Sequence, residues 1–348
     1  MKQTVVILFG GHSSEYDVSL QSAASVIENM DYETYNVILI GITRNGEWLK
    51  YSGDVNCIRN DTWHRHPSCV QAVISPDRST HGILVMNGKN VTTIHVDVVF
   101  PVLHGKNGED GTVQGLLEMA GIPFVGCGML SSALCMDKDM AHRLVKQAGI
   151  TVPESVVVFS PVSDEELLEK TAHLKYPLYV KPANSGSSIG ITKIFGPGDL
   201  KYSVEIAFLH DRKVIIEEAV DGFEVGCAIL GNDVLKIGEV DEIELSQGFF
   251  DYTEKYTLKT SKIHMPARIN SDTAERIKET AVLIYRTLGC KGFARVDLFL
   301  TPRNEIVFNE VNTIPGFTSH SRYPNMLKGA GMSFPQIINE LIRLATEQ

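Results

Sequence analysis

Residues 293–312 read FARVDLFLTPRNEIVFNEVN and contain two strand-like runs separated by a short polar segment. Side chains of a strand alternate between its two faces. If a two-residue loop, Arg303-Asn304, joins the runs, Asp297 lies opposite Glu310 and Arg295 lies opposite Asn312. Directly opposed residues point to the same side of a sheet. The stretch therefore predicts an antiparallel hairpin with four polar side chains gathered on one face.

These side chains predict a metal site. Asp297, Glu310 and Asn312 offer only oxygen ligands, and Mg²⁺ takes such ligands when nucleotide phosphates complete its octahedron. Arg295 would lie beside them as a cation. A pair of salt-bridged carboxylates on a sheet face, without a metal, is the alternative that the pattern leaves open.

Composition limits the classes of protein to consider. The 348 residues are enough for two or three domains, and the net charge of −10 argues against a general nucleic-acid binder. The six cysteines show no CxxC spacing, which is typical of reduced thiols in a cytoplasmic protein. The apolar run at residues 5–9 is too short for a membrane span or a signal peptide. We expect a cytoplasmic protein that binds neither nucleic acid nor membrane.

The first third of the chain alternates strand-like and helix-like segments, which predicts a parallel, doubly wound α/β sheet. Strands are expected at residues 4–9, 36–42, 96–102 and 121–126, with helices at 16–29 and from 112 onward. Residues 45–95 predict only short hairpins. We assign residues 1–130 to this first domain.

The rest of the chain has an α+β pattern that predicts two more domains, at residues 131–225 and 226–348. A helix from residue 131 carries MDKDMAHRLVKQAG. The second domain is expected to hold strands at 155–159, 178–181, 191–194 and 214–217, with one helix near 163–173. The third is expected to hold strands at 227–230 and 236–240, a polar loop at 244–262, a helix at 272–288, the hairpin and a helix at 333–346.

The sequence GSSIG at residues 186–190 matches G-x-S-x-G, which would make Ser188 a hydrolase nucleophile. A nucleophile elbow requires a helix after the serine, but the strand-like ITKIF follows. As a strand–loop–strand unit, the segment offers backbone N–H groups to an anion, with Lys181 at its base. A plain hairpin turn is the alternative. No P-loop motif occurs, and GCGMLS at 126–131 lacks the downstream acid of a dinucleotide site.

Acids and lysines of the second domain predict a nucleotide site. Glu217 and Glu218 end a strand-like run and Glu224 follows closely. Carboxylates suit ribose hydroxyls and the amino group of adenine, and Lys138 and Lys181 would face the phosphates. Each residue alone could be an ordinary surface charge, but together with the metal cluster they form a pattern.

Seven segments together resemble a known family. GGHSSEYDVS, HGKNGEDGTVQGLLE, MDKDMAHRLV, YVKPANSGSSIG, FDYTEKY, ARVDLF and NEVNTIPGFTSHSRYP occur in this order along most of the chain. They resemble the D-alanine–D-alanine ligases of the ATP-grasp superfamily. The resemblance implies a three-domain ATP-grasp fold, with an N-terminal parallel doubly wound sheet, and a homodimer. It also implies that ATP phosphorylates a first D-alanine and that the amine of a second amino acid attacks the acyl phosphate.

The resemblance implies roles for individual residues. The implied catalytic residues are Glu15, Ser187, Tyr256, Arg295, Gly316 and Ser321, of which Glu15 would hold the ammonium group of the first D-alanine. The implied ATP contacts are Lys138, Lys181, Ser188, Glu217, Glu218, Glu224 and Lys255. Two Mg²⁺ ions, or Mn²⁺ in their place, would be held by Asp297, Glu310 and Asn312. Loop 246–262, which carries Lys255 and Tyr256, is expected to close over ATP.

His104 and Arg322 would line the pocket of the second substrate. Arg322, in SRYP, stands where many of these ligases have an apolar residue, and the segment resembles ligases of vancomycin resistance that use D-lactate or D-serine. Tyr256 matches the ligases that use an amine, which disfavours D-lactate. A guanidinium can donate to the D-serine hydroxyl.

The sequence therefore predicts a D-alanine–D-serine ligase. If Arg322 instead pairs with a nearby acid, other residues would determine the specificity. A housekeeping D-alanine–D-alanine ligase is the alternative function, and a serine hydrolase using Ser188 is a remote one. The complete set of metal ligands together with Arg295 argues against an ATP-binding module without catalytic activity.

Overall fold

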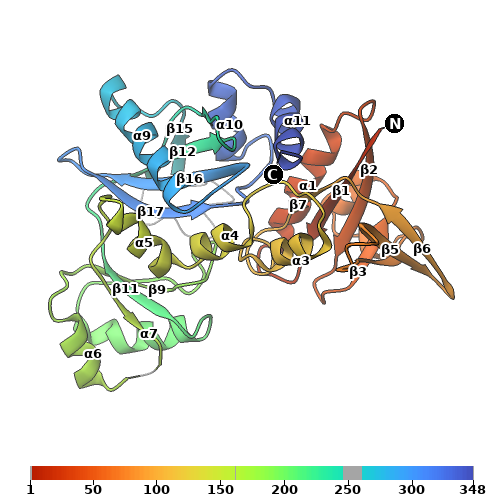
Figure 1. Cartoon of the computed structure of the whole chain (residues 1–348). Helices are drawn as coiled ribbons and strands as arrows, with labels where there is room; N and C mark the ends of the chain where they lie inside the picture. Colours follow the sequence, from red (N-terminus) through yellow and green to blue (C-terminus); the bar gives the residue numbers. More distant parts are fainter. Residues whose placement is uncertain (1, 161, 246–260, 348) are drawn as a thin grey trace.

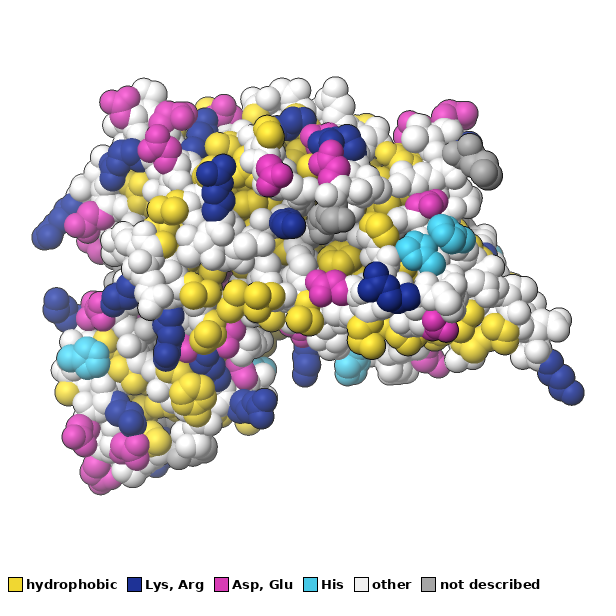
Figure 2. All heavy atoms as spheres, viewed as in Figure 1, with side chains coloured by type: hydrophobic (Ala, Val, Ile, Leu, Met, Phe, Trp, Pro, Cys, Tyr) yellow, Lys and Arg dark blue, Asp and Glu magenta, His cyan; other side chains and the backbone are white. Residues whose placement is uncertain are grey.

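The computed structural model describes residues 2–160, 162–245 and 261–347 (Figure 1). Over these ranges the strands form three sheets, each built from a successive part of the chain. On the face drawn in Figure 2, acidic and basic side chains are interspersed. None of the helices in the described ranges is both long and apolar enough to cross a membrane.

The N-terminal sheet combines a parallel centre with an antiparallel extension. β1 (Gln3–Gly10) pairs in parallel with β2 (Tyr35–Ile42) and with β7 (Val98–Val102), which confirms the predicted parallel sheet. The extension is antiparallel and consists of β3 (Trp48–Tyr51), β4 (Val70–Ile74), β5 (Gly82–Asn87) and β6 (Asn90–His95). It occupies the region where only hairpins were expected. The short helices α2 (Val55–Arg59) and η1 (Trp63–Arg65) lie between β3 and β4.

Strand β1 is buried on both faces, as expected for the central strand of a parallel sheet. Its odd-numbered residues from Val5 to Phe9 pack with α1 (Tyr16–Glu28) and α11 (Phe334–Ala345), whereas Val6 and Leu8 pack on the side of α3 (Thr112–Ala120). The C-terminal helix α11 therefore covers the N-terminal sheet beside α1 (Figure 1). The sequence placed this helix in the third domain and gave no sign of this contact.

The second sheet is antiparallel and has the order β10-β9-β11-β8. Its strands are β8 (Ser155–Val158), β9 (Leu178–Pro182), β10 (Thr192–Ile194) and β11 (Val214–Glu218). Its core includes residues of α6 (Asp164–Thr171) and α7 (Leu200–Phe208). Only one helix was predicted here, and α7 with the short η2 (Pro197–Asp199) before it was missed.

The third sheet has the order β15-β14-β12-β16-β17, with β13 beside β12. Its strands are β12 (Phe223–Leu230), β13 (Lys236–Ile237), β14 (Asp241–Leu245), β15 (Ser261–His264), β16 (Phe293–Leu300) and β17 (Ile306–Asn312). Helix α9 (Ser271–Thr287) packs into its core, and α10 (Arg322–Gly329), which was not predicted, contacts β12.

Two expectations need correction. The helix predicted from residue 131 is two helices, α4 (Met129–Met136) and α5 (Lys138–Gln147). They are separated because Asp137 has extended backbone angles and its carboxylate accepts a hydrogen bond from the Met140 N–H (3.1 Å), which makes it an N-cap. The strand expected at 121–126 is a single bridge between Val99 and Phe124. The predicted domain limits, after residues 130 and 225, lie within α4 and β12, and the division stays a prediction.

The β16–β17 hairpin has the predicted pairing but not the predicted turn. Asp297 lies opposite Glu310 and Arg295 opposite Asn312. However, Leu300 pairs with Ile306, so the turn is longer than two residues. In a regular hairpin, this longer turn would shift the pairing of the two strands by one residue. A β-bulge between the Asp297–Glu310 and Leu298–Phe308 pairs restores it. The extra residue in that bulge is Asn309.

Candidate active site

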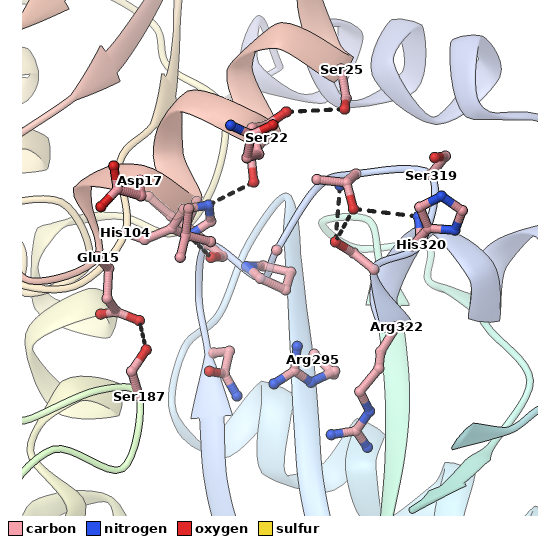
Figure 3. A pocket seen from close by; sticks show the side chains of 18 of the residues that line it. Glu15, Asp17, Ser22, Ser25, His104, Ser187, Arg295, Ser319, His320 and Arg322 are labelled. Atoms are coloured by element: carbon pink, nitrogen blue, oxygen red, sulfur yellow. Dashed lines mark hydrogen bonds between the residues drawn. The ribbon is translucent and has the colours of Figure 1, made fainter. Parts of the chain in front are cut away.

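Two adjoining cavities, each of about 630 Å³, lie where the sheets meet. The inter-sheet cavity is lined by residues of the second and third sheets, including Lys181, Glu217 and Glu310. The junction cavity is lined by α1, by the loop that follows β17, by the start of α10 and by Arg295 (Figure 3). Ser187 and Glu224 belong to the linings of both. The predicted site residues in the described ranges therefore fall in one continuous region.

Buried charges line the inter-sheet cavity. Lys181 Nζ lies 2.6 Å from one oxygen of Glu217, and Lys138 Nζ lies 3.3 Å from Glu310 Oε2. Lys138 also donates to the Ser185 carbonyl (2.7 Å). The other oxygen of Glu217, Oε2, is buried and has no hydrogen-bond partner in the described part of the chain. A buried acceptor of this kind is costly unless a ligand completes it.

The loop between β9 and β10 has an unusual backbone conformation. Ser187 and Ser188 have consecutive positive φ angles of 51° and 58°, which non-glycine residues rarely adopt. Such strain is concentrated at functional sites. Ser188 is followed by a turn and then by β10 instead of a helix, so the structure lacks the elbow that a serine hydrolase requires. Glu218, which also lines the cavity, accepts a hydrogen bond from the Lys175 N–H (2.9 Å).

Three of the four residues predicted to lie together on the β16–β17 hairpin are in direct contact. Arg295 donates to both carboxylate oxygens of Asp297 (2.8–3.1 Å), and Asn312 Nδ2 donates to Asp297 Oδ2 (2.9 Å). Glu310, opposite Asp297, lines the inter-sheet cavity. Two carboxylates and an amide oxygen on one sheet face are a donor set that fits a hard cation such as Mg²⁺.

Glu15 precedes α1 and reaches across to the loop of the second sheet, where its carboxylate accepts a hydrogen bond from the Ser187 hydroxyl (Figure 3). Two glycines make room for it. A Cβ atom at Gly105 would lie 2.3 Å from Glu15 Oε2, and a Cβ at Gly186 would lie 2.7 Å from it. Both distances are too short for any side chain. A side chain at either position would therefore displace the Glu15 carboxylate from its present place.

His104 lines the junction cavity as predicted, but both of its ring nitrogens are bonded within the protein. Nδ1 lies 2.9 Å from the Ile314 carbonyl, which can only accept, so Nδ1 carries the proton. Nε2 then accepts from the Ser22 hydroxyl (3.0 Å; Figure 3). Burial lowers the pKa of the His104 imidazole, so the ring is neutral. His104 thus holds the loop after β17 against α1.

Glu109 is a cavity residue that the sequence analysis missed. Its two oxygens accept hydrogen bonds from the Gly105 N–H (2.7 Å) and the Ile314 N–H (3.2 Å). The pKa of Glu109 is raised to about 8, mainly by burial and secondly by the negative charge of the neighbouring Glu15. It lies within the HGKNGEDG motif, but nothing in the spacing separated this acid from its polar neighbours.

Arg322 occupies the centre of an acidic group that contains a second missed residue, Asp241. Its Nε and Nη2 donate to the two oxygens of Asp241 (2.8 and 2.7 Å), and Nη1 donates to Glu224 (2.8 Å). Nη1 also lies 3.3 Å from Asp297. The alternative left open by the sequence, pairing of Arg322 with nearby acids, is therefore what the structure shows. The donors expected to face a substrate hydroxyl are engaged with carboxylates.

The remaining predicted residues lie partly in the junction cavity and partly outside the described ranges. Gly316 and Ser321 line the cavity, and Ser321 is the N-cap residue of α10. Its hydroxyl accepts a hydrogen bond from the Thr318 N–H (2.9 Å). Lys255, Tyr256 and most of the loop predicted to close over ATP lie outside the described residues.

The chain matches known proteins over nearly its whole length. A family model for the D-ala D-ala ligase N-terminus matches residues 4–127, and one for the C-terminus matches residues 144–343. The crystal structure of VanG D-Ala:D-Ser ligase from Enterococcus faecalis is 57% identical, with a TM-score of 0.92, and the match covers 99% of this chain and 100% of that one.

Two curated relatives match along their lengths. The D-alanine–D-alanine ligase of Caldicellulosiruptor bescii is 45% identical, and the match covers 100% of this chain and 96% of the relative. The vancomycin B-type resistance protein VanB of Enterococcus faecalis is 47% identical, with 100% and 99% covered.

Proposed function

The chain belongs to the D-Ala–D-Ala ligase family of ATP-dependent ATP-grasp ligases, and we propose that it joins D-alanine to D-serine. One observation carries the choice of D-serine, the 57% identity to a D-Ala:D-Ser ligase over nearly the whole chain. The relative named as a D-alanine–D-alanine ligase is less similar, at 45% identity. The product would be a D-alanyl-D-serine dipeptide for modified peptidoglycan precursors.

ATP would bind in the inter-sheet cavity. The unpartnered Oε2 of Glu217 would accept from the adenine amino group, and Glu224 would contact the ribose. Lys138, Lys181 and the N–H groups around Ser188 would face the phosphates. Lys255 would join them from the loop that the described ranges omit. These roles are supported by the position of each described residue in one cavity of a size suited to a nucleotide.

Asp297, Glu310 and Asn312 would hold two Mg²⁺ ions, with Mn²⁺ as an alternative. When bound, the ions would neutralise charge on the phosphates during phosphoryl transfer. The fit rests on the oxygen-only donor set and on the shared sheet face. Lys138, close to Glu310, would add a positive charge on the same side.

The amino-acid steps would occur in the junction cavity. Glu15, held by Ser187, would bind the ammonium group of the first D-alanine. That substrate's carboxylate oxygen would attack the γ-phosphorus of ATP, and ADP would leave. The deprotonated amine of D-serine would then attack the acyl carbon, and phosphate would leave. Arg295 and the Gly316 N–H would stabilise the developing oxyanion. Ser321, at the start of α10, would bind the D-serine carboxylate, where the helix N-terminus favours an anion.

A housekeeping D-alanine–D-alanine ligase is the second candidate, and the pairing of Arg322 with Asp241 and Glu224 favours it. A guanidinium bonded to acids cannot contact a hydroxyl as freely as the sequence predicted. In the D-serine proposal, Arg322 would act mainly by fixing the positions of these acids beside the junction cavity.

Competition between second substrates tests the proposal. The purified protein would receive ATP, Mg²⁺ and D-alanine with equal concentrations of D-serine and D-lactate, and mass spectrometry would identify the products. D-alanyl-D-serine should exceed both D-alanyl-D-alanine and D-alanyl-D-lactate. A predominance of D-alanyl-D-alanine would identify the housekeeping enzyme. Absence of phosphate release with any of these substrates would overturn ligase activity itself.

Three further expectations stay predictions. These are a homodimer, a division into domains at 1–130, 131–225 and 226–348, and a cytoplasmic location. Light scattering would test the first and limited proteolysis the second.

A further inference from the structure

The β-bulge at Asn309 determines which side chains of β17 face the cavity. With the same turn but no bulge, Asn309 would lie opposite Asp297, and Glu310 would point to the opposite face of the sheet. The extra residue of the bulge moves Glu310 back opposite Asp297 and Asn312 back opposite Arg295. The proposed metal ligands on β17 therefore depend on this local irregularity.

His142 of α5 contacts the bulge at two points. Its Nε2 lies 2.8 Å from the Asn309 carbonyl oxygen, and its ring packs edge-on against Phe308 with centroids 5.4 Å apart. Lys138, one helical turn earlier on the same face of α5, lies 3.3 Å from Glu310. One face of this helix thus contacts three consecutive residues of β17, including the bulged one.

The hydrogen bond defines the state of the imidazole. A carbonyl only accepts, so Nε2 of His142 carries the proton. Burial lowers the pKa of His142, so the ring is neutral and Nδ1 has no proton. Nδ1 is buried and has no hydrogen-bond partner in the described residues. An apolar side chain could fill this space without leaving an unsatisfied acceptor. The property that requires a histidine is therefore its Nε2–H donor.

We propose that His142 is a positioning residue that holds the bulged Asn309 carbonyl and thereby directs Glu310 and Asn312 toward the metal ions. The inference rests on the proposed function only for the presence of that metal site. Residues behind the ligands of a metal commonly change its affinity about 10–100-fold when they are replaced. Loss of the Nε2–H donor should therefore weaken metal binding within that range, while the pocket for adenine at Glu217 stays intact.

Three variants separate this role from general stability. His142→Phe keeps a ring against Phe308 but has no donor, and His142→Leu is a second donor-free variant should the first not fold. His142→Gln places an amide N–H at the same position along the side chain. The matched control is Tyr285→Phe, because the Tyr285 hydroxyl also donates from a buried position to a backbone carbonyl, that of Gly231 (2.8 Å).

The readout is Mn²⁺ binding to the ADP complex, followed by electron paramagnetic resonance, with ADP affinity measured separately without metal. We expect donor-free variants to bind Mn²⁺ at least about tenfold more weakly with unchanged ADP affinity. His142→Gln should bind within about threefold of wild type, and Tyr285→Phe should match wild type even where its melting temperature falls.

Wild-type Mn²⁺ affinity in the donor-free variants would overturn the inference, as would equal weakening in Tyr285→Phe. If the wild-type ADP complex binds no Mn²⁺, the proposed metal site fails and the inference with it. A wild type that binds Mn²⁺ but makes no D-alanyl-D-serine would overturn only the substrate assignment, and the His142 comparison would still decide the inference.

Discussion

The two adjoining cavities differ in how their polar side chains are hydrogen-bonded. In the junction cavity Arg322 is bonded to Asp241 and Glu224, and both oxygens of Glu109 accept backbone hydrogen bonds. In the inter-sheet cavity Glu217 has one oxygen paired with Lys181 and the other left unpartnered among the described residues. Among the described residues, these groups of the junction cavity are satisfied by the protein, whereas Glu217 in the inter-sheet cavity keeps one unpartnered acceptor.

This difference predicts how substitutions should act. Where protein groups satisfy one another, removing a member exposes buried charge and reduces stability. Where a side chain is arranged for a ligand and its removal leaves no buried charge unpaired, removing it reduces turnover and spares the fold. Each prediction below tests the contrast, beginning with the largest effect.

Glu310→Gln should lower turnover by orders of magnitude, because it removes a negative charge that the metal ions require while keeping the size of the side chain. Phosphate release at saturating ATP and D-alanine measures it, with the melting temperature as a check on folding. Glu305→Gln, at an exposed position of the same hairpin, is the matched control and should be active. Normal activity in Glu310→Gln would remove this residue from the metal site.

Arg322→Leu should reduce the free energy of unfolding by about 3–5 kcal/mol, because it leaves Asp241, Glu224 and Asp297 close together without their shared cation. Urea unfolding measures this change. A double variant with Asp241→Leu should recover part of the loss, because apolar residues often replace a buried ion pair at little cost. A fully stable Arg322→Leu protein would show that this acidic group is not held together by the arginine.

Glu109 should make stability fall as pH rises. Its pKa is about 8 in the folded state, above the ordinary value of 4.5, so between these pH values the folded protein holds a proton that the unfolded chain has released. Stability is therefore greatest below the lower value and is lost toward the higher. From pH 6 to 8.5 the loss should be roughly 2.5 kcal/mol.

Glu109→Gln cannot ionise and should lose that part of the pH dependence. Urea unfolding of both proteins at pH 6 and pH 8.5 gives the comparison. Parallel changes in the two proteins over this range would mean that Glu109 is already ionised at pH 6.

The sequence predicted local geometry well where a repeat was present. Period-two alternation placed Arg295 and Asp297 on one face of β16, and the pairing with Glu310 and Asn312 was correct. The assumed turn was nevertheless too short. The pairing is as predicted because the Asn309 bulge compensates for the longer turn. Neither feature has a signature in the sequence, since a bulge arises from contacts such as the one to His142.

Contacts between distant parts of the chain could not be predicted from the sequence. Arg322 and Asp241 are far apart along the chain, and no spacing rule joins them. The contact of α11 with the N-terminal sheet was missed for the same reason. The break between α4 and α5 was visible in principle, because Asp137 is an ordinary N-cap residue, but the surrounding apolar pattern continued through it. Tertiary packing decided each of these cases.

The prediction with the smallest expected effect changes the nucleotide that binds in the inter-sheet cavity and leaves the protein unchanged. Glu217 Oε2 is the acceptor assigned to the adenine amino group, so purine riboside triphosphate, which lacks that group, should bind with a KM roughly tenfold higher than ATP. Inosine triphosphate should be poorer still, because its carbonyl oxygen would face a carboxylate. Changing the ligand is preferable to replacing Glu217, since replacement would also leave the buried Lys181 unpaired and destabilise the fold. Steady-state kinetics with the three nucleotides gives the order directly, with kcat expected to change much less than KM because the amino group is remote from the transferred phosphate. Equal KM values for ATP and purine riboside triphosphate would mean that Glu217 Oε2 does not accept a hydrogen bond from adenine. The difference between the two cavities would then not reflect nucleotide binding.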